Sequence, residues 1–237
     1  MRLIIQKNNE NINTIDDWRL KAAPADSVKH WKDGRSAKEM ARFTFTGEFE
    51  GLIASILNEL GIYEEVYYCE PEAKTYFGRG FGKGGPRNHD LLMCGENSVI
   101  GVEAKVSESY DELISKKSVH RVNALMKYLC GVDTPSDVDK ENLYYQLLTA
   151  SVGTIKAAVE RGKDKAVVLF ITFTGNVSKE RNYEQKININ TDAFSYFQQK
   201  LKLDRNGKLQ DVPGVKGKFE CWIRHITVDI NTSYLIK

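Results

Sequence analysis

The chain has no run of apolar residues long enough to cross a membrane as a helix. A membrane-spanning helix needs about 18–20 consecutive apolar residues, and no segment of the 237 residues approaches that length. The first residues, "MRLIIQKNNENIN", contain an apolar run that is too short for a signal peptide. We therefore expect a protein that does not associate with membranes and that works in the cytoplasm.

Cysteine and histidine are scarce, and neither is clustered. The four cysteines, Cys69, Cys94, Cys130 and Cys221, lie far apart, and the four histidines are equally scattered. Zinc sites use ligand pairs at short spacings, and no such pair is present. The sequence therefore argues against a structural zinc site, and it fits a reducing compartment.

An excess of one charge sign is also lacking. The chain has 34 Lys and Arg residues against 32 Asp and Glu residues, which leaves a net charge of +2. A surface that is basic overall would mark a nucleic-acid binder. Any contact with nucleic acid must therefore come from local basic patches.

No linker, low-complexity tract or internal repeat divides the sequence. With 41% apolar and 28% charged residues, the chain is long enough for one well-buried core. We therefore predict a single domain over residues 1–237.

Hydrophobic periodicity predicts both helices and strands. Short helices are expected within 15–46, and longer ones over 47–60, 112–130, 136–162 and 192–203, with Thr191 as the N-cap of the last. Strands are expected over 62–70, 90–93, 98–106, 165–175 and 218–230. The run at 165–175 is apolar throughout, which is typical of a central strand covered on both faces. The order predicts an α/β fold, or α+β by a stricter definition, with a mixed central sheet flanked by helices.

The most informative stretch is "NHDLLMCGENSVIGVEAKV", which contains Asp90, Glu103 and Lys105. Two alternating apolar segments surround the turn-like "CGEN", so this stretch is predicted to be a hairpin. Residues two apart in a strand face the same side. Glu103 and Lys105 should therefore project together, while Val102 and Ala104 face the other way.

These residue types suit metal-dependent hydrolysis of a phosphodiester. Mg²⁺ or Mn²⁺ prefers oxygen ligands and keeps several waters, so one or two carboxylates suffice to hold it. Asp90, Glu103 and the backbone carbonyl of Ala104 are the expected ligands, and Lys105 would orient water or stabilise developing charge. A salt-bridged, solvated sheet face remains the alternative, because a second "EAK" occurs at 72–74 without a suitably placed upstream Asp.

A third acid usually helps to close such a site. The helix expected over 47–60 carries Glu48 and Glu50 in its first turn, and we favour Glu50 as a further metal ligand. The alternative is that an acid in the first turn simply interacts with the helix dipole.

A glycine-rich segment precedes the hairpin. Residues 80–85 match G-x-G-x-x-G, but they lead through Pro86 into a strand rather than into a helix, which argues against a dinucleotide site. Arg79, Lys83 and Arg87 surround these glycines and are expected to bind the substrate backbone. A loop kept soluble by its charges is the alternative.

The helix expected over 112–130 has a basic side. We expect that side to be solvated. Its residues are Lys116, Lys117, His120, Arg121 and Lys127.

The order of Glu50 on a first helix, Asp90 on a strand and "EAK" on the next strand resembles the PD-(D/E)XK superfamily of restriction-endonuclease-like nucleases. Tyr145-Gln146 on the following helix resembles the glutamine- and tyrosine-bearing helix of exonuclease-like branches, which implies a catalytic role for Gln146. The alternative is that Gln146 is an ordinary surface residue of that helix. The chain departs from the motif's name, because His89 rather than proline precedes Asp90. The segments "KHWKDGRSAKEMA", "NHDLLM", "VEAKV" and "YQLLTA" also resemble a group of uncharacterised bacterial proteins.

The superfamily resemblance covers residues 47–175 and implies a restriction-endonuclease-like core there. Residues 1–46 would then be an N-terminal elaboration, and 176–237 would add a helix and a strand to the sheet. It implies a nuclease that uses Mg²⁺ or Mn²⁺ and acts on DNA rather than RNA. A catalytically inactive binding module for nucleic acid or protein, in a mobile-element or defence setting, is the alternative. Whether the protein forms a homodimer is left open.

Overall fold

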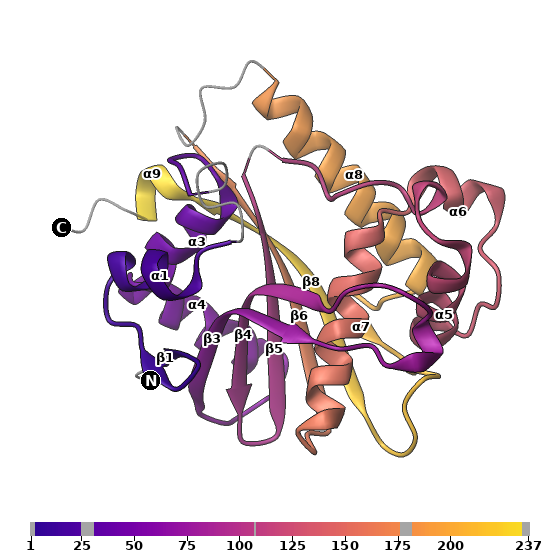
Figure 1. Cartoon of the computed structure of the whole chain (residues 1–237), viewed down its shortest axis with the longest axis horizontal. Helices are drawn as coiled ribbons and strands as arrows, with labels where there is room; N and C mark the ends of the chain where they lie inside the picture. The colour runs from indigo at the N-terminus through magenta and orange to yellow at the C-terminus, as the bar shows by residue number, and fades with distance from the viewer. Residues whose placement is uncertain (1–2, 25–30, 107, 176–181, 234–237) are drawn as a thin grey trace.

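The computed structural model describes residues 3–24, 31–106, 108–175 and 182–233. Within these residues the strands form one sheet in the order β2-β1-β3-β4-β5-β6-β8-β7 (Figure 1). The strands are β1 Ile4–Lys7, β2 Glu10–Asn11, β3 Val66–Thr75, β4 Arg87–Gly95, β5 Ser98–Lys105, β6 Lys165–Thr174, β7 Lys208–Leu209 and β8 Glu220–Asp229.

Helices cover both faces of this sheet. They are α1 Ile15–Ala22, α3 Ser36–Thr44, α4 Gly47–Glu59, α5 Val119–Cys130, α6 Asp137–Asn142, α7 Tyr145–Glu160, α8 Tyr183–Leu201 and α9 Ile230–Ser233. Two short 3₁₀ turns, η1 Arg79–Phe81 and η2 Ile114–Lys116, lie in the connections.

The sheet is mixed, as predicted. Strands β3, β4 and β5 pair in antiparallel fashion, whereas β5, β6 and β8 run parallel to one another. The parallel steps need crossover connections, and α7 and α8 provide them. Strand β6 lies between β5 and β8, so its uniformly apolar sequence corresponds to burial on both faces. The α/β class is therefore confirmed.

Two hydrophobic clusters lie on opposite faces of the sheet. Helices α1, α3 and α4 pack on the face that carries Val102 and Ala104. Helices α5, α7 and α8 pack on the face that carries Val99 and Phe170 (Figure 1). Alternation along β5 therefore sends its odd-numbered residues, including Glu103, toward α7.

Several predicted boundaries were wrong, and tertiary pairing explains them. The helix expected over 112–130 begins only at Val119, and the helix expected over 136–162 is divided into α6 and α7. Leu113 and Tyr144 form an isolated antiparallel bridge, which keeps both segments extended before the helices begin. Thr191 is not an N-cap, because it lies inside α8 and donates a hydrogen bond to the carbonyl of Ile187.

Strand β3 also differs from the prediction. It begins at Val66 and continues to Thr75, so it includes the second "EAK" at 72–74. The short strands β1, β2 and β7 were not predicted, because their few residues carry little periodicity.

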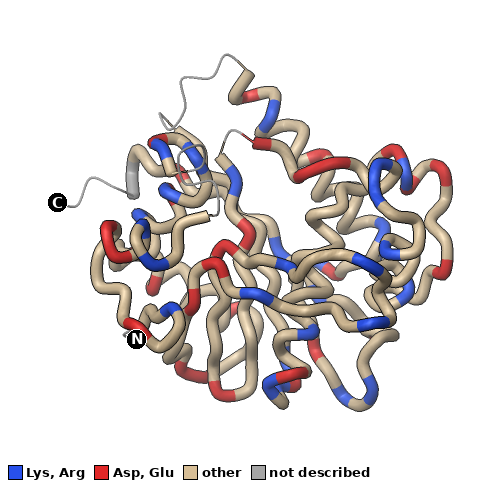
Figure 2. Tube along the Cα trace, in the orientation of Figure 1, with Lys and Arg blue, Asp and Glu red and all other residues tan. Residues whose placement is uncertain are grey.

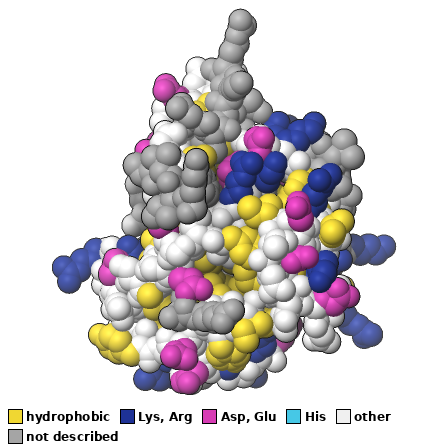
Figure 3. All heavy atoms as spheres, turned by 90° about the vertical axis from the view of Figure 1, so that its left-hand side faces the viewer, with side chains coloured by type: hydrophobic (Ala, Val, Ile, Leu, Met, Phe, Trp, Pro, Cys, Tyr) yellow, Lys and Arg dark blue, Asp and Glu magenta, His cyan; other side chains and the backbone are white. Residues whose placement is uncertain are grey.

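Charged residues of both signs are distributed along the whole trace (Figure 2), in keeping with the small net charge. On the face that Figure 3 shows, hydrophobic side chains gather in the middle with charged ones around them. No helix among the described residues is long and apolar enough to span a membrane.

Candidate functional site

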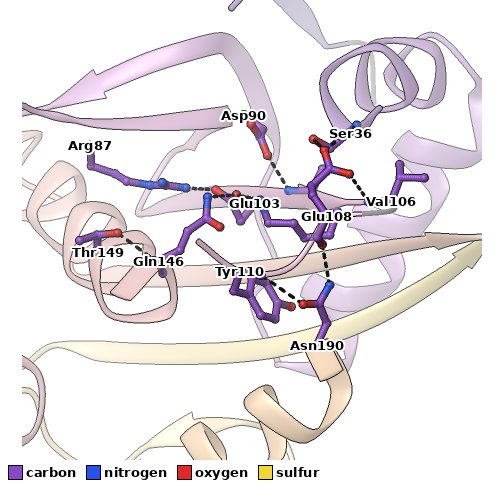
Figure 4. A network of polar contacts seen from close by, with 12 residues as sticks. Ser36, Arg87, Asp90, Glu103, Val106, Glu108, Tyr110, Gln146, Thr149 and Asn190 are labelled. Atoms are coloured by element: carbon purple, nitrogen blue, oxygen red, sulfur yellow. Dashed lines mark hydrogen bonds and ion pairs between the residues drawn. The ribbon is translucent and has the colours of Figure 1, made fainter. Parts of the chain in front are cut away.

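Glu103, near the end of β5, is the centre of a buried polar cluster (Figure 4). Its side chain is 2% exposed. Lys105 Nζ lies 2.8 Å from Glu103 Oε1, and Gln146 Nε2 donates to the same oxygen at 2.5 Å. The other oxygen, Oε2, forms an ion pair with the guanidinium of Arg87. Two strands, β4 and β5, and one helix, α7, therefore each bring a side chain to this carboxylate.

The predicted alternation positions this cluster. Glu103 and Lys105 lie on one face of β5, and Ala104 is buried in the core on the opposite face. Gln146 lies in the first turn of α7 and donates its hydrogen bond to Glu103 from that helix. The resemblance places Gln146 on this helix. The structure therefore brings Glu103, Lys105 and Gln146 into contact.

The outer parts of β3 and β4 extend across α7 toward α5 (Figure 1). Gly153 in α7 makes this close approach possible, because a Cβ there would lie 2.9 Å from Cγ of Arg87 and 3.2 Å from Cε1 of His89. Arg87 is therefore held against α7 and directed at Glu103. It was expected to bind substrate from the glycine-rich loop, but it is the first residue of β4 and pairs with the central carboxylate.

Asp90 lies on β4 beside this cluster. Its Oδ2 accepts a hydrogen bond from the backbone N–H of Ala104 at 2.6 Å. Burial raises the pKa of Asp90, while the charge of Lys105 and the hydrogen bond from Ala104 act in the opposite direction. Burial lowers the pKa of Lys105, and the negative charge of Asp90 partly offsets this effect. Such perturbed, mutually dependent groups are typical of functional sites, although structural ion pairs also produce them.

Glu108 is a member of this region that the sequence analysis missed. Its Oε1 accepts a hydrogen bond from Ser36 Oγ at 2.7 Å, and its backbone carbonyl accepts one from Asn190 Nδ2 at 3.0 Å (Figure 4). Its negative charge raises the pKa of both Asp90 and Lys105. The only available signal was its position three residues after Lys105.

Glu72 is the second missed acid. It lies on β3 beside Asp90, and burial together with the charge of Asp90 raises the pKa of Glu72 to about 8. The second "EAK" was set aside because no Asp precedes it suitably in the sequence. That reasoning was incomplete, since strand pairing brings Asp90 next to Glu72.

Glu50 and Glu48 do not join the centre. Helix α4 packs on the face of the sheet opposite to Glu103. Glu50 Oε1 accepts a hydrogen bond from the backbone N–H of Leu3 at 3.2 Å, and Glu50 lines a cavity of about 780 Å³ beside β1. Among the described residues, no hydrogen bond or ion pair connects either acid to Glu103 or Asp90.

The two remaining loop cations differ in position. Arg79 is exposed in η1. Lys83 is also exposed, and it lines a cavity of about 480 Å³ whose wall includes Arg87 and Gln146. This cavity therefore adjoins the Glu103 cluster. His89, which replaces the proline of the motif's name, is buried, and its Nε2 lies 3.0 Å from Thr75 Oγ1.

The donors suit a hard divalent cation in their chemistry. Asp90, Glu103 and the carbonyl of Ala104 supply oxygen, and two carboxylates with several waters suffice for Mg²⁺. In the described part of the chain, however, no three acidic, histidine or cysteine side chains are arranged to hold a metal. At Glu103, Arg87, Lys105 and Gln146 already contact the carboxylate. A cation that binds Oε2 would have to displace Arg87.

The chain was compared with curated proteins, with solved structures and with protein families. No curated protein and no solved structure matches it. One family, described as "Domain of unknown function (DUF6946)", matches residues 11–223, a span that includes Asp90, Glu103, Lys105 and Gln146. Because the match covers most of the sequence, the chain belongs to this DUF6946 family.

Proposed function

We propose that the protein is a metal-dependent nuclease that hydrolyses phosphodiester bonds in DNA. The observation that carries the proposal is the convergence of Asp90, Glu103, Lys105 and Gln146 from two paired strands and the start of one helix. Two carboxylates and a lysine in one buried place suit the metal-dependent hydrolysis of a phosphodiester. The order of α4, β4, β5 and α7 also agrees with the resemblance to the PD-(D/E)XK superfamily.

Each residue has a defined role in this proposal. Asp90 and Glu103 would hold Mg²⁺ or Mn²⁺ together with the carbonyl of Ala104. The bound ion supplies Lewis-acid polarisation of the phosphate and a more acidic water. Lys105 stabilises charge on the phosphate or orients the water. Gln146 holds the carboxylate of Glu103 in one orientation through its amide.

Four free cysteines support action in the reducing cytoplasm.

A second candidate is a catalytically inactive module that binds nucleic acid or protein. The ion pair of Arg87 with Glu103 favours it, because a carboxylate that is already neutralised has less attraction for a cation. The two candidates differ in one respect that can be measured. Only the nuclease requires a divalent cation and an intact Glu103 for turnover.

The test is incubation of the purified protein with plasmid, linear and single-stranded DNA, with Mg²⁺, with Mn²⁺ or with EDTA. Asp90→Asn, Glu103→Gln and Lys105→Met are compared with Glu96→Gln, which changes an exposed acid in the β4–β5 turn. We expect cleavage that requires the cation, falls at least about 100-fold in the three site variants and is unchanged in Glu96→Gln.

Equal cleavage by the wild type and all three site variants would indicate a contaminating nuclease and would contradict the proposal. DNA binding without cleavage under every metal condition would instead support the inactive module.

A further inference from the structure

Arg121 is a buried cation that forms no ion pair with any acid in the described part of the chain. It was expected on the solvated side of a helix, but it is 7% exposed in the first turn of α5. Its Nε donates to Tyr145 Oη at 2.5 Å, and its Nη2 donates to the carbonyl of Gly85 at 2.8 Å. Among the described residues no carboxylate lies within ion-pair distance of it. A buried charge without a counter-charge is costly, so an anion that enters beside Arg121 would stabilise it.

Arg121 lies in the wall of the 480 Å³ cavity beside Glu103. The lining includes four cations, Lys83, Arg87, Lys117 and Arg121, and one acid, Asp111. Two of the cations already have carboxylate partners. Arg87 pairs with Glu103, and Lys117 lies 3.0 Å from Asp111 and 2.9 Å from Glu112. Lys83 and Arg121 are therefore the cations available to a ligand.

The glycine-rich loop, residues 80–85, packs closely against the first turn of α5. A Cβ at Gly84 would collide with the guanidinium of Arg121, and a Cβ at Gly82 would lie 2.5 Å from Cδ2 of His120. The glycines thus let the loop backbone close over Arg121. The guanidinium is further fixed over the ring of Phe77, 4.7 Å from its centroid.

The first turn of α5 adds to the positive field in the cavity. Ser118, the N-cap residue, lines the cavity, and its side chain makes no capping hydrogen bond. The free N–H groups and the dipole of a helix N-terminus attract phosphate. The volume of the cavity falls in the range of about 300–1,000 Å³ that small ligands occupy, which suits a nucleotide better than a bare phosphate ion.

We propose that this cavity binds one nucleotide of a nucleic-acid strand through its phosphate, with Arg121 as the principal anion contact and Lys83 as the second. The inference rests on the proposed function in taking the ligand to be part of a strand. Arg87 and Gln146 both line the cavity and contact Glu103, so the neighbouring phosphodiester of the strand would reach the carboxylate centre. The cavity is then the subsite next to the scissile bond.

Binding is tested without cleavage, in EDTA and at low salt, by the fluorescence anisotropy of a labelled 20-nucleotide single strand. We expect Arg121→Gln to raise Kd about tenfold or more and Lys83→Gln about threefold. Arg19→Gln, which changes an exposed cation of α1 on the opposite face of the sheet, is the matched control and should change Kd less than twofold.

Competition distinguishes the sources of phosphate. Deoxyadenosine monophosphate should displace the strand and deoxyadenosine should not, because only the former carries the phosphate. Displacement by inorganic phosphate alone at the same concentration would show that the base and sugar contribute nothing and would overturn the assignment of a nucleotide.

Because Arg121 is buried, the thermal unfolding of each variant is also measured to check that it folds. Lys83→Gln keeps the test valid if Arg121→Gln does not fold. Wild-type Kd in both Arg121→Gln and Lys83→Gln would overturn the inference even if Glu103-dependent cleavage is found. Conversely, Arg121-dependent binding without any cleavage would support the inference and contradict the proposed nuclease.

Discussion

Glu72 on β3 lies beside Asp90 on β4. Pro71 pairs with Leu91 and Ala73 pairs with His89, so the two acidic residues lie between these pairs. The backbone of Glu72 is left-handed, with φ of 49°, which is unusual for a residue other than glycine. Burial and the charge of Asp90 together raise the pKa of Glu72 to about 8. The surroundings of Glu72 therefore favour the neutral form of its carboxyl group.

This pair predicts how stability depends on pH. The folded pKa of Glu72 lies above its ordinary value of 4.5, so the folded protein binds more protons than the unfolded chain between these values. The contribution is complete below pH 4.5 and is lost as the pH rises through about 8. Glu72→Gln should remove this loss and raise the free energy of unfolding at pH 9 by about 1–3 kcal/mol relative to the wild type.

Urea denaturation in EDTA at pH 5 and pH 9 measures this effect, with Glu96→Gln as the control. An equal loss of stability between the two pH values in the wild type and in Glu72→Gln would show that Glu72 has no raised pKa.

The ion pair of Arg87 and Glu103 should contribute to folding as a unit. Glu103 is buried and Arg87 is mostly covered, so removal of one partner leaves an uncompensated charge with little access to water. Arg87→Met and Glu103→Gln should each lower the free energy of unfolding by about 3–5 kcal/mol. In the double variant the loss should be smaller than the sum by about 1–3 kcal/mol. Additive losses in this double-mutant cycle would mean that the two groups do not interact.

The loop glycine next to Arg121 should not tolerate a side chain. In Gly84→Ala the new Cβ would displace the guanidinium of Arg121 and break its bonds to Tyr145 and Gly85. We expect a loss of about 1–2 kcal/mol in thermal or chemical unfolding. Gly80→Ala, where a Cβ meets nothing within 4 Å, is the control and should unfold like the wild type. A loss of the same size in both would exclude the specific collision.

Gly101 on β5 lets the sheet approach α7. A Cβ at this position would overlap the hydroxyl of Thr154, which is buried in α7. Gly101→Ala should therefore cost about 1–3 kcal/mol through overpacking. Gly51→Ala, at an open position of α4, should instead stabilise by about 0.5–1 kcal/mol because alanine favours a helix. Calorimetry of the two variants should give shifts in Tm of opposite sign, and a common sign would contradict this packing argument.

The hairpin and the side on which Glu103 and Lys105 lie were predictable, because turn residues and alternation act locally. The central strand β6 was predictable for the same reason, since its composition records burial on both faces. The division between α6 and α7 was not, because the bridge between Leu113 and Tyr144 joins segments that are distant in the sequence. Thr191 was misjudged because a good N-cap residue is also accommodated inside a helix when its hydroxyl bonds to the preceding turn.

The residues of the candidate site also fall into two groups, those that the sequence predicted and those that only the fold placed there. Asp90, Glu103, Lys105 and Gln146 were predicted from spacing and from the resemblance, and the fold brings them to one place. Glu72 and Glu108 were missed because their contribution depends on pairing across β3 and β4 and on contact with α3. Glu50 has the expected position on a first helix, but that helix packs on the other face of the sheet.

The sequence by itself determined the α/β class, the hairpin and the common face of Glu103 and Lys105, since all three follow from periodicity along one segment. Only the tertiary structure decided which charges meet. It joined Arg87 to Glu103, placed Glu72 beside Asp90 and buried Arg121 without a carboxylate partner among the described residues. The physical reason is that electrostatic interactions depend on distance and burial in space, and neither is encoded in the order of residues along a single strand or helix.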